Sequence, residues 1–414
     1  MAEKTQFSYD LNKNIEYIKN ALSNCCDLKF RHIKLNNGHG ADACAFYIEG
    51  MVDNAYVSDN VLRPIMQAAE NDRLKKNLID KIYNELVYVG NVKTETDPNS
   101  LIMQVITGSI GILIENESTA LAVEAKGYEK RPVEEPTSET VVKGMRAGFV
   151  ESIRTNTALI RRIVKSPKLK IESLFLGRIT NTEINVAYIE GLVMDGLVEE
   201  IKKRLKRIDA DGILSTGILQ EHIEDSVLSV FSLSYSTERP DRACSCLLEG
   251  RALILVDNSP FVIIVPVTIT HYLQSAEDYS TKYLAASITR LLRLVAINLN
   301  LLLPAIYVAI FSFHQEMIPK NLLKTVSEAR ERLPFPIFFE MLLLESAFDI
   351  LREAGIRLPR PIGQAVSIVG ALVIGQAAVA ARLVSPPSII VVALTAICSF
   401  TIPVTEAANT YRVL

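Results

Sequence analysis

The chain contains 414 residues, of which 49% are hydrophobic and 22% charged, and its formal net charge is −3. This length predicts two or three domains instead of one core. The slightly negative charge argues against a nucleic-acid-binding protein, because such a protein carries a basic stripe. Six cysteines and five histidines are scattered without metal-ligand spacing, and the sequence has no phosphate-binding glycine loop or nucleophile–base pair. We therefore expect no enzyme activity, no catalytic residues, no metal site and no cofactor.

The first two thirds of the chain alternate between helical and strand patterns. Apolar residues recur at three- and four-residue steps where helices are expected, at 11–26, 62–85, 148–164 and 197–208. Short apolar runs predict strands at 44–50, 101–106, 110–114 and 120–123. An α/β fold class follows for this N-terminal region.

Two short blocks recur along the chain at nearly one spacing. Tyr47–Val52 returns as Tyr188–Val193, and Gly108–Asn116 returns as Gly250–Asn258, at offsets of 141 and 142 residues. Both copies of the second block end in an acid followed by Asn, which tolerates the left-handed conformations of tight turns. The repeat predicts two related α/β subdomains. They are expected at 1–127 and 171–280, with a linker and helix over 128–170.

Two related subdomains allow two interpretations. They can enclose a cleft in which a small ligand binds. They can equally pack as a rigid spacer or an oligomerisation ring. No residue pattern in either subdomain specifies a ligand, so both interpretations stay open.

The chain becomes strongly apolar toward its C-terminus. Three uncharged runs are long enough to cross a ~30 Å hydrocarbon layer as helices, at 294–311, 362–381 and 386–404. The amphipathic stretch 283–293 precedes the first run and ends in Arg290 and Arg293, which suit the lipid headgroup boundary. We expect a helical domain over 281–414 with three to four membrane helices in a lipid bilayer.

A further apolar segment, 334–352, follows a charged connector at 319–332 and carries acids on one face. Glu345 and Asp349 lie four residues apart in it. The segment can lie in the membrane interface. It can instead line a water-filled vestibule, since acids within membranes face cavities and mark ion paths. In that case Glu345 and Asp349 form an acidic vestibule.

The segment 361–381 has small residues at three- and four-residue steps. Such a face lets another helix approach closely in lipid. It can serve as a pore wall, in which an apolar ring gates by dewetting, or as ordinary packing within one subunit. The candidate pore-lining residues are Gly363, Val366, Ser367, Gly370, Ala371, Val373 and Ile374.

Several short blocks occur in order along the linker, the second subdomain and the membrane part. They are Pro136–Gly144, Glu151–Asn156, Glu238–Asp241, Leu247–Arg251, Glu277–Tyr279, Leu351–Gly355, Pro361–Gln364 and Val384–Pro386. In number and order they resemble the A subunits of spore germinant receptors, the GerA-type family. The resemblance runs from about residue 130 to 403, while residues 1–127 share the family's layout more than its motifs.

The resemblance implies a membrane subunit of a spore nutrient-germinant receptor. It implies a multi-pass protein of the spore inner membrane that assembles with copies of itself, as a pentamer, into a ligand-gated cation channel. The implied partners are a transporter-like B subunit and a lipoprotein C subunit, with no nucleic acid. Because the N-terminus is polar and lacks a signal peptide, we expect the large N-terminal region to be cytoplasmic.

The chain also departs from the family pattern. Where the family has an acid and a glycine after the pore-like helix, this chain has Ala380 and Arg382. The family continues through further membrane helices after the position of Pro403, so we expect a truncated copy. Two other functions stay open: a non-conducting sensor or scaffold, and an accessory germination channel that amplifies the signal.

Overall fold

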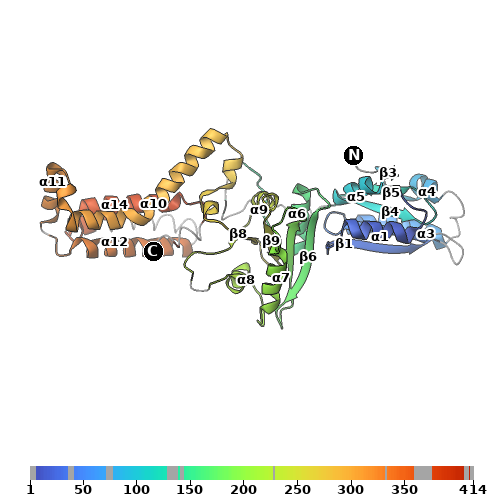
Figure 1. Cartoon of the computed structure of the whole chain (residues 1–414), viewed down its shortest axis with the longest axis horizontal. Helices are drawn as coiled ribbons and strands as arrows, with labels where there is room; N and C mark the ends of the chain where they lie inside the picture. Colours follow the sequence, from blue (N-terminus) through green and yellow to red (C-terminus); the bar gives the residue numbers. More distant parts are fainter. Residues whose placement is uncertain are drawn as a thin grey trace. The chain divides into compact units, whose positions relative to one another are not determined.

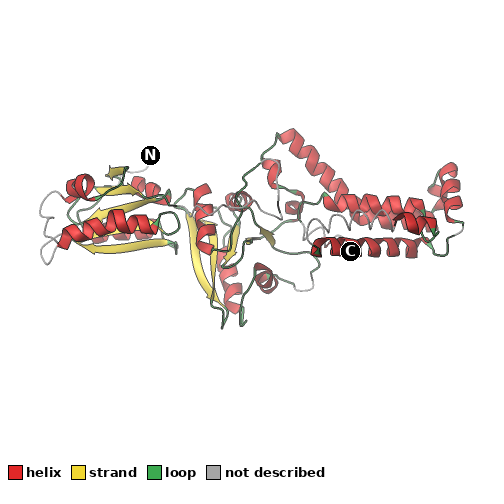
Figure 2. Cartoon of the chain, turned by 180° about the vertical axis from the view of Figure 1, so that it is seen from behind, coloured by secondary structure: helices red, strands yellow, loops and turns green. Residues whose placement is uncertain are grey.

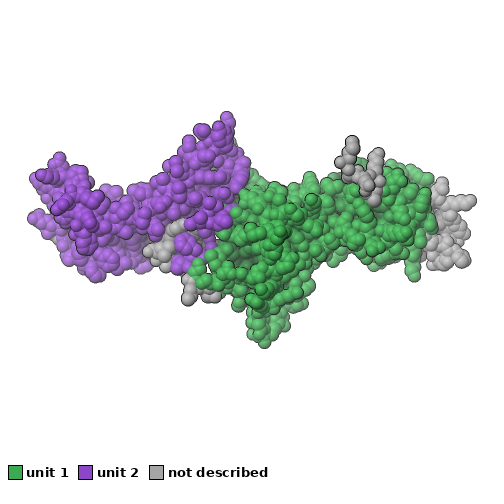
Figure 3. All heavy atoms as spheres, viewed as in Figure 1, with its two compact units in different colours: residues 1–229, 233–267 green, residues 230–232, 268–414 purple. Residues whose placement is uncertain are grey.

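The computed structural model describes residues 6–35, 42–70, 78–127, 139, 144–226, 229–331, 333–358, 375–404 and 410. Two compact units divide the chain (Figure 3). The first unit comprises residues 1–229 and 233–267, and it contains both β-sheets. The second comprises residues 230–232 and 268–414, and it is helical (Figures 1 and 2).

The first sheet has five antiparallel strands in the order β1-β2-β4-β5-β3. They are β1 (Leu28–Lys34), β2 (Asp42–Ile48), β3 (Val92–Glu95), β4 (Ser109–Ile114) and β5 (Ala120–Glu124). Alternate residues of a strand face opposite sides of its sheet. In β2, Phe46 packs with α1 (Leu11–Ala21) and α5 (Pro98–Ile106), whereas Ala45 packs with the segment 57–87. Both faces are therefore covered, and every residue of β4 is buried.

The second face of this sheet is covered by short helical pieces. These are α2 (Asn54–Val57), the π-turn η1 (Ser58–Leu62), α3 (Arg63–Glu70), α4 (Leu78–Lys81) and the π-turn η2 (Ile82–Leu86). Val61, Ile65 and Ile82 are fully buried in this layer. The helical stretch expected at 62–85 is thus present in several pieces.

The strand expected at 101–106 is wrong, because these residues belong to helix α5. The Asp97 side chain accepts hydrogen bonds from the backbone N–H groups of Asn99 and Ser100, and Pro98 occupies the first turn. A capping acid followed by proline is a strong helix start. A short apolar run has no periodicity that separates a buried helix from a strand.

The second sheet repeats the strand order of the first, as β6-β7-β9-β10-β8. Its strands are β6 (Leu169–Leu176), β7 (Thr182–Ile189), β8 (Tyr235–Thr237), β9 (Ala252–Val256) and β10 (Val262–Val265). Helices α7 (Leu197–Arg207) and α8 (Thr216–Ile223) pack on one face through Leu205 and Leu219. Helices α6 (Ile153–Ile163) and α9 (Pro240–Leu248) pack against each other and against β9.

The internal repeat is confirmed by topology and register. The repeated Glu-Gly blocks follow β2 and β7, which are both second in their sheets. Cys44 pairs with Leu113 in the first sheet, and the equivalent pair in the second sheet is Asn185 with Leu255. The turns after β4 and β9 each hold an Asn at positive φ, 63° at Asn116 and 65° at Asn258.

The second unit is built from helices. Its elements are the 3₁₀ turns η3 (Ile269–Leu273), η4 (Ala276–Tyr279) and η5 (Gln315–Met317), and the helices α10 (Tyr283–Phe313), α11 (Lys320–Arg330), α12 (Ile337–Arg357) and α14 (Pro386–Phe400). The amphipathic stretch and the first uncharged run form one continuous helix, α10, with Pro304 inside it. Within the described residues, α10 is the one helix long and apolar enough to cross a membrane, and α14 is a shorter apolar helix.

Candidate functional site

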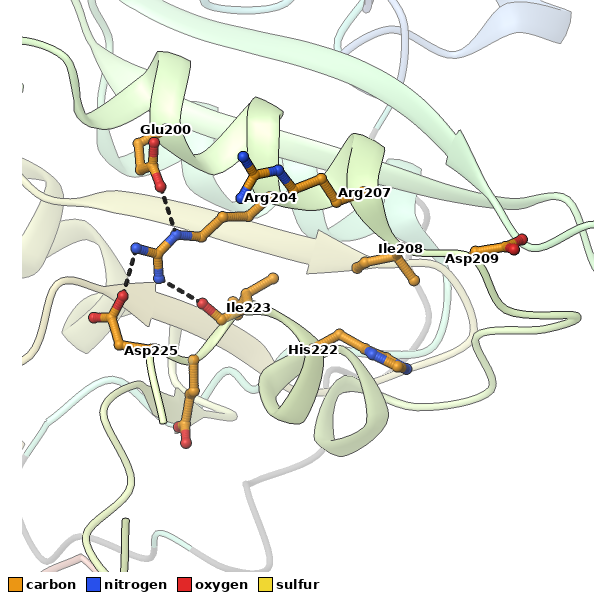
Figure 4. Close-up of a pocket in the computed structure, with 9 residues that line it drawn as sticks. Glu200, Arg204, Arg207, Ile208, Asp209, His222, Ile223 and Asp225 are labelled. Atoms are coloured by element: carbon orange, nitrogen blue, oxygen red, sulfur yellow. Dashed lines mark hydrogen bonds and ion pairs between the residues drawn. The ribbon is translucent and has the colours of Figure 1, made fainter. Parts of the chain in front are cut away.

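A polar hollow of about 300 Å³ lies beside α7 and α8 (Figure 4). Arg204 donates hydrogen bonds to Glu200 at 2.9 Å, to the carbonyl oxygen of Ile223 at 2.7 Å and to Asp225 at 2.5 Å. The hydrogen bonds to these two carboxylates raise the pKa of Arg204 above its usual range. These contacts tie α7 to the segment after α8, so the guanidinium is engaged in holding the fold. The remaining lining residues are Arg207, Ile208, Asp209, His222 and Glu224.

A buried ion pair joins the two sheet regions. Asp27, just before β1, accepts hydrogen bonds from Nε and Nη2 of Arg161 on α6, the latter at 2.7 Å, and both side chains are almost inaccessible to solvent. Beside the pair, the Cys26 N–H donates to the carbonyl oxygen of Ile171 on β6 at 2.8 Å. Breaking a buried pair leaves an uncompensated charge, at a cost of about 3–5 kcal/mol. A buried charge pair and a backbone hydrogen bond thus join the two sheet regions.

A second contact across the junction explains one copy of the repeated Glu-Gly block. The Arg154 guanidinium lies 3.6 Å from Glu49 and bonds Glu183 at 2.9 Å. Next to Glu49, Gly50 has φ +83°, and a Cβ there would lie 3.1 Å from the Arg154 carbonyl oxygen. Glycine is thus needed twice at this position, for the left-handed backbone and for the close approach of α6.

Two of the sequence blocks meet in space where the linker contacts β8. Glu139 accepts hydrogen bonds from the hydroxyls of Tyr235 at 2.8 Å and Thr237 at 2.7 Å. The buried Arg239 donates to the carbonyl oxygens of Glu139 and Met145, and it pairs with Asp241 at 2.6 Å. Burial raises the pKa of Glu139, although both hydroxyl bonds act against it. The sequence showed both blocks but gave no sign that they touch.

The start of α10 is held by a carboxylate. Asp278 accepts hydrogen bonds from Arg290 at 3.0 Å, from Arg293 at 2.8 Å and from the Ser275 N–H at 3.1 Å. Burial alone would raise the pKa of Asp278, but the bonds from Arg293, Arg290 and Ser275 outweigh it and lower that pKa. The two arginines expected at the headgroup boundary are therefore paired with a protein acid.

The structure places the two acidic vestibule candidates but not the pore-lining candidates. Glu345 is half-buried and Asp349 is exposed on α12, one turn apart and so on one side of the helix. The seven pore-lining candidates lie outside the described residues. They are Gly363, Val366, Ser367, Gly370, Ala371, Val373 and Ile374.

The end of the 361–381 segment is described from residue 375 onward. Residues 375–380 are helical, and Arg382 follows at φ 57°. The Leu383 N–H bonds the Ala378 carbonyl oxygen at 2.9 Å, and the Arg382 N–H bonds the Val379 carbonyl oxygen at 3.0 Å. This pair of bonds is the Schellman helix end, which usually holds glycine at the left-handed position.

One buried acid in the helical unit was missed by sequence reasoning. Glu340, in the first turn of α12, is 1% exposed and accepts a hydrogen bond from the N–H of Ser385, the residue that starts α14. Ser385 contacts Ser388 at 2.9 Å, and Ser388 donates to the Tyr307 hydroxyl on α10 at 3.2 Å. The available signal was a single acid within the apolar run Phe335–Met341.

Together these features describe a protein with a two-sheet N-terminal region and a helical part that contains a helix of membrane-crossing length. The chain belongs to the Bacillus/Clostridium GerA spore germination protein family, whose model matches residues 16–414.

Curated relatives agree with this family over almost the whole chain. Spore germination protein KA of Bacillus subtilis (strain 168) is 41% identical over 407 residues, which cover 98% of this chain and 74% of that protein. Spore germination protein GerLA of Bacillus cereus is 35% identical over 416 residues, which cover 100% of this chain and 84% of that protein. Their names describe spore germination and no enzyme activity.

A solved structure supports the fold of the N-terminal region. The crystal structure of the N-terminal domain of the A subunit of the Bacillus megaterium spore germinant receptor GerK3 aligns with a TM-score of 0.52 at 34% identity. The alignment covers 64% of this chain and 98% of that domain. The resemblance noted in the sequence blocks is thereby confirmed.

Proposed function

We propose that this chain is the membrane subunit of a spore nutrient-germinant receptor and forms an oligomeric, ligand-gated cation channel that triggers germination. The observation that carries the proposal is membership of a spore germination family over residues 16–414 in a chain with a membrane-length helix, α10. The relatives' names point to spore germination as the process, and the length and apolar composition of α10 point to a membrane as the location.

The proposed channel is multi-pass in the spore inner membrane, with residues 1–127 and 171–280 as cytoplasmic subdomains, 128–170 as linker and helix, and 281–414 as membrane domain. Copies of the chain assemble, as a pentamer, with a transporter-like B subunit and a lipoprotein C subunit. No nucleic acid takes part. The buried Asp27–Arg161 pair supports a role for the N-terminal region as a stiff element that transmits movement.

The pore wall is assigned to the segment 361–381. Its small face at Gly363, Ser367, Gly370 and Ala371 would let identical helices approach around an axis. Val366, Val373 and Ile374 would supply the apolar ring that closes by dewetting. Glu345 and Asp349 on α12 would concentrate cations at the mouth.

A non-conducting sensor or scaffold is the alternative function, since a rigid junction serves a scaffold equally well. An accessory channel that amplifies the signal is a variant of the first proposal. Flux measurements separate conduction from scaffolding, and dependence on a B subunit separates a receptor from an accessory channel.

The test is cation flux through proteoliposomes that contain the full chain, alone and with its B and C partners. Vesicles loaded with potassium should release it faster than matched vesicles that contain an unrelated membrane protein. Release only with the B subunit supports a receptor subunit, and release without it supports an accessory channel. Equal release from both kinds of vesicle under every condition contradicts conduction and leaves the scaffold function.

A further inference from the structure

Among the described residues of the helical unit, the most deeply buried acid lies at a helix start. Glu340 on α12 bonds the N–H of Ser385, which precedes the first turn of α14. Its side chain has no exposed area, and the Arg330 guanidinium of α11 lies 3.7 Å from its second oxygen. One carboxylate of α12 therefore contacts both α11 and the residue that precedes α14.

The start of α14 has no side-chain cap of its own, and the Ser385 N–H finds its acceptor on α12. Pro386 and Pro387 have no N–H, and the Ser385 hydroxyl contacts Ser388 and does not cap the backbone. A helix start carries partial positive charge, which favours an anion beside it. Glu340 supplies that anion from a neighbouring helix.

The hydrogen-bonding capacity of this contact is only partly used, so the contact opens at a lower free-energy cost than a fully bonded one would. Among the described residues, Glu340 Oε2 and Arg330 Nη1 are buried without a hydrogen-bond partner. A buried charge with incomplete hydrogen bonding is costly, so the arrangement competes with one in which the groups separate and find other partners. A fully bonded network would hold the helices in one state.

The contact lies close in sequence to the segment proposed as the pore wall. Ser385 lies four residues after Ala381, the end of the segment 361–381, and the Schellman bonds described above close the helix between them. Only residues 382–384 separate this helix end from Ser385. Tyr307, through Ser388, links the same point to α10.

We propose that Glu340 is a positioning residue that holds the start of α14 on α12, and that loss of this contact raises the basal ion release of the proposed channel. The expected change in ion release rests on the proposed channel function, whereas the contact between Glu340 and Ser385 does not depend on conduction. A charge-assisted hydrogen bond of about 1.5–3 kcal/mol corresponds to about tenfold or more in an equilibrium between two states.

The test uses the full chain in potassium-loaded proteoliposomes with its partner subunits and without nutrient. Glu340→Gln keeps an acceptor oxygen but removes the charge, and it should raise basal potassium release about tenfold. The matched control is Glu353→Gln, which removes the same charge from an exposed position of α12 where Glu353 pairs with Arg357 at 2.6 Å. The control should leave basal release unchanged.

A second readout does not depend on flux. Hydrogen exchange of the peptide 384–392 should be faster in Glu340→Gln than in Glu353→Gln, because the Ser385 N–H loses its charged acceptor. Arg330→Gln, which leaves Glu340 in place, should give a smaller increase in both readouts. It also provides a second variant if Glu340→Gln folds poorly.

The outcomes separate this inference from the channel proposal. If the native chain conducts and Glu340→Gln matches Glu353→Gln in release, the inference is overturned while the channel stands. If no protein conducts but exchange rises in Glu340→Gln alone, the channel proposal fails and the positioning role stands without its gating consequence. Equal exchange in both variants overturns the positioning role.

Discussion

Asp27 and Arg161 lie 134 residues apart in the sequence and form an ion pair that is almost inaccessible to solvent. The pair joins the segment before β1 to α6, and so it connects the two copies of an internally repeated fold. Neither residue belongs to the repeated blocks, although Glu49 and Gly50 of one such block lie against α6 at the same junction.

Removing one partner of this pair should be costly. We expect Asp27→Asn to lower the free energy of unfolding of residues 1–267 by about 3–5 kcal/mol, because the Arg161 charge stays buried without a carboxylate. Urea denaturation measures the change, and the separately crystallised domain of the GerK3 relative shows that such a region can be prepared alone.

The control for this pair is Asp59→Asn, which breaks an exposed pair with Arg63 and should cost less than about 1 kcal/mol. The double variant Asp27→Asn with Arg161→Met should lose less stability than Asp27→Asn alone, because no buried charge remains. Equal losses for Asp27→Asn and Asp59→Asn would show that the junction is not held by this pair.

Glu139 should make stability depend on pH in the acidic range. Its pKa is raised in the folded state, so the folded protein binds more protons than the unfolded chain between the two pKa values. Stability from this group is therefore present below the unfolded pKa of about 4.3 and is lost as the pH rises through the raised folded value.

Glu139→Gln tests this pH dependence because a neutral amide does not titrate. The unfolding midpoint of residues 1–267, followed from pH 4 upward, should fall less steeply in Glu139→Gln than in the native chain. Glu16→Gln, at an exposed position of α1, serves as the control and should follow the native curve. Parallel curves for all three proteins contradict the raised pKa.

Arg382 should be replaceable by glycine with a gain in stability. It takes the left-handed position of the Schellman end at φ 57°, where a side chain costs about 1–2 kcal/mol and glycine does not. Thermal unfolding of the full chain in detergent should show a higher midpoint for Arg382→Gly. Ala380→Gly, inside the helix, should lower the midpoint by weakening the helix. A lower midpoint for Arg382→Gly as well would mean that Arg382 makes stabilising contacts that outweigh its backbone strain.

The protein should be integral to a membrane through 294–311, 362–381 and 386–404. Each segment is long enough to span with modest tilt, and the first lies within α10. After alkaline carbonate treatment of membranes, the full chain should remain in the pellet, while residues 1–267 expressed alone should be released. Release of the full chain into the supernatant contradicts the membrane domain.

A cysteine scan across 362–381 should locate the pore wall. Thiol modification should change current at the inward positions of the helix, and Val366→Ala or Ile374→Ala should increase current without nutrient by weakening the apolar ring. Four native thiols should react slowly with the reagent, because burial raises the pKa to about 11 at Cys26, Cys44 and Cys246 and to about 12 at Cys244. If modification changes no current at any position, the pore assignment is wrong.

The sequence by itself determined the features that depend on local pattern. The repeated blocks predicted two related α/β subdomains, because similar short-range patterns of apolar residues and turns fold into similar arrangements. The two sheets do share one strand order. The acid–Asn turns at Asn116 and Asn258 were predicted because a side chain's tolerance of positive φ is a property of one residue. The uncharged run within α10 predicted a membrane helix, because the length and composition of a segment can be read directly from the sequence.

Tertiary structure decided the features that depend on distant partners. A charge at Asp27, Glu139 or Glu340 looks alike in a sequence, and only the fold shows that each is met by a partner more than 40 positions away. Residues 101–106 were mistaken for a strand because the apolar run is too short for its period to be read, and packing on the sheet decides its burial. Long-range contacts are set by how the elements close on one another, and no local pattern carries that information.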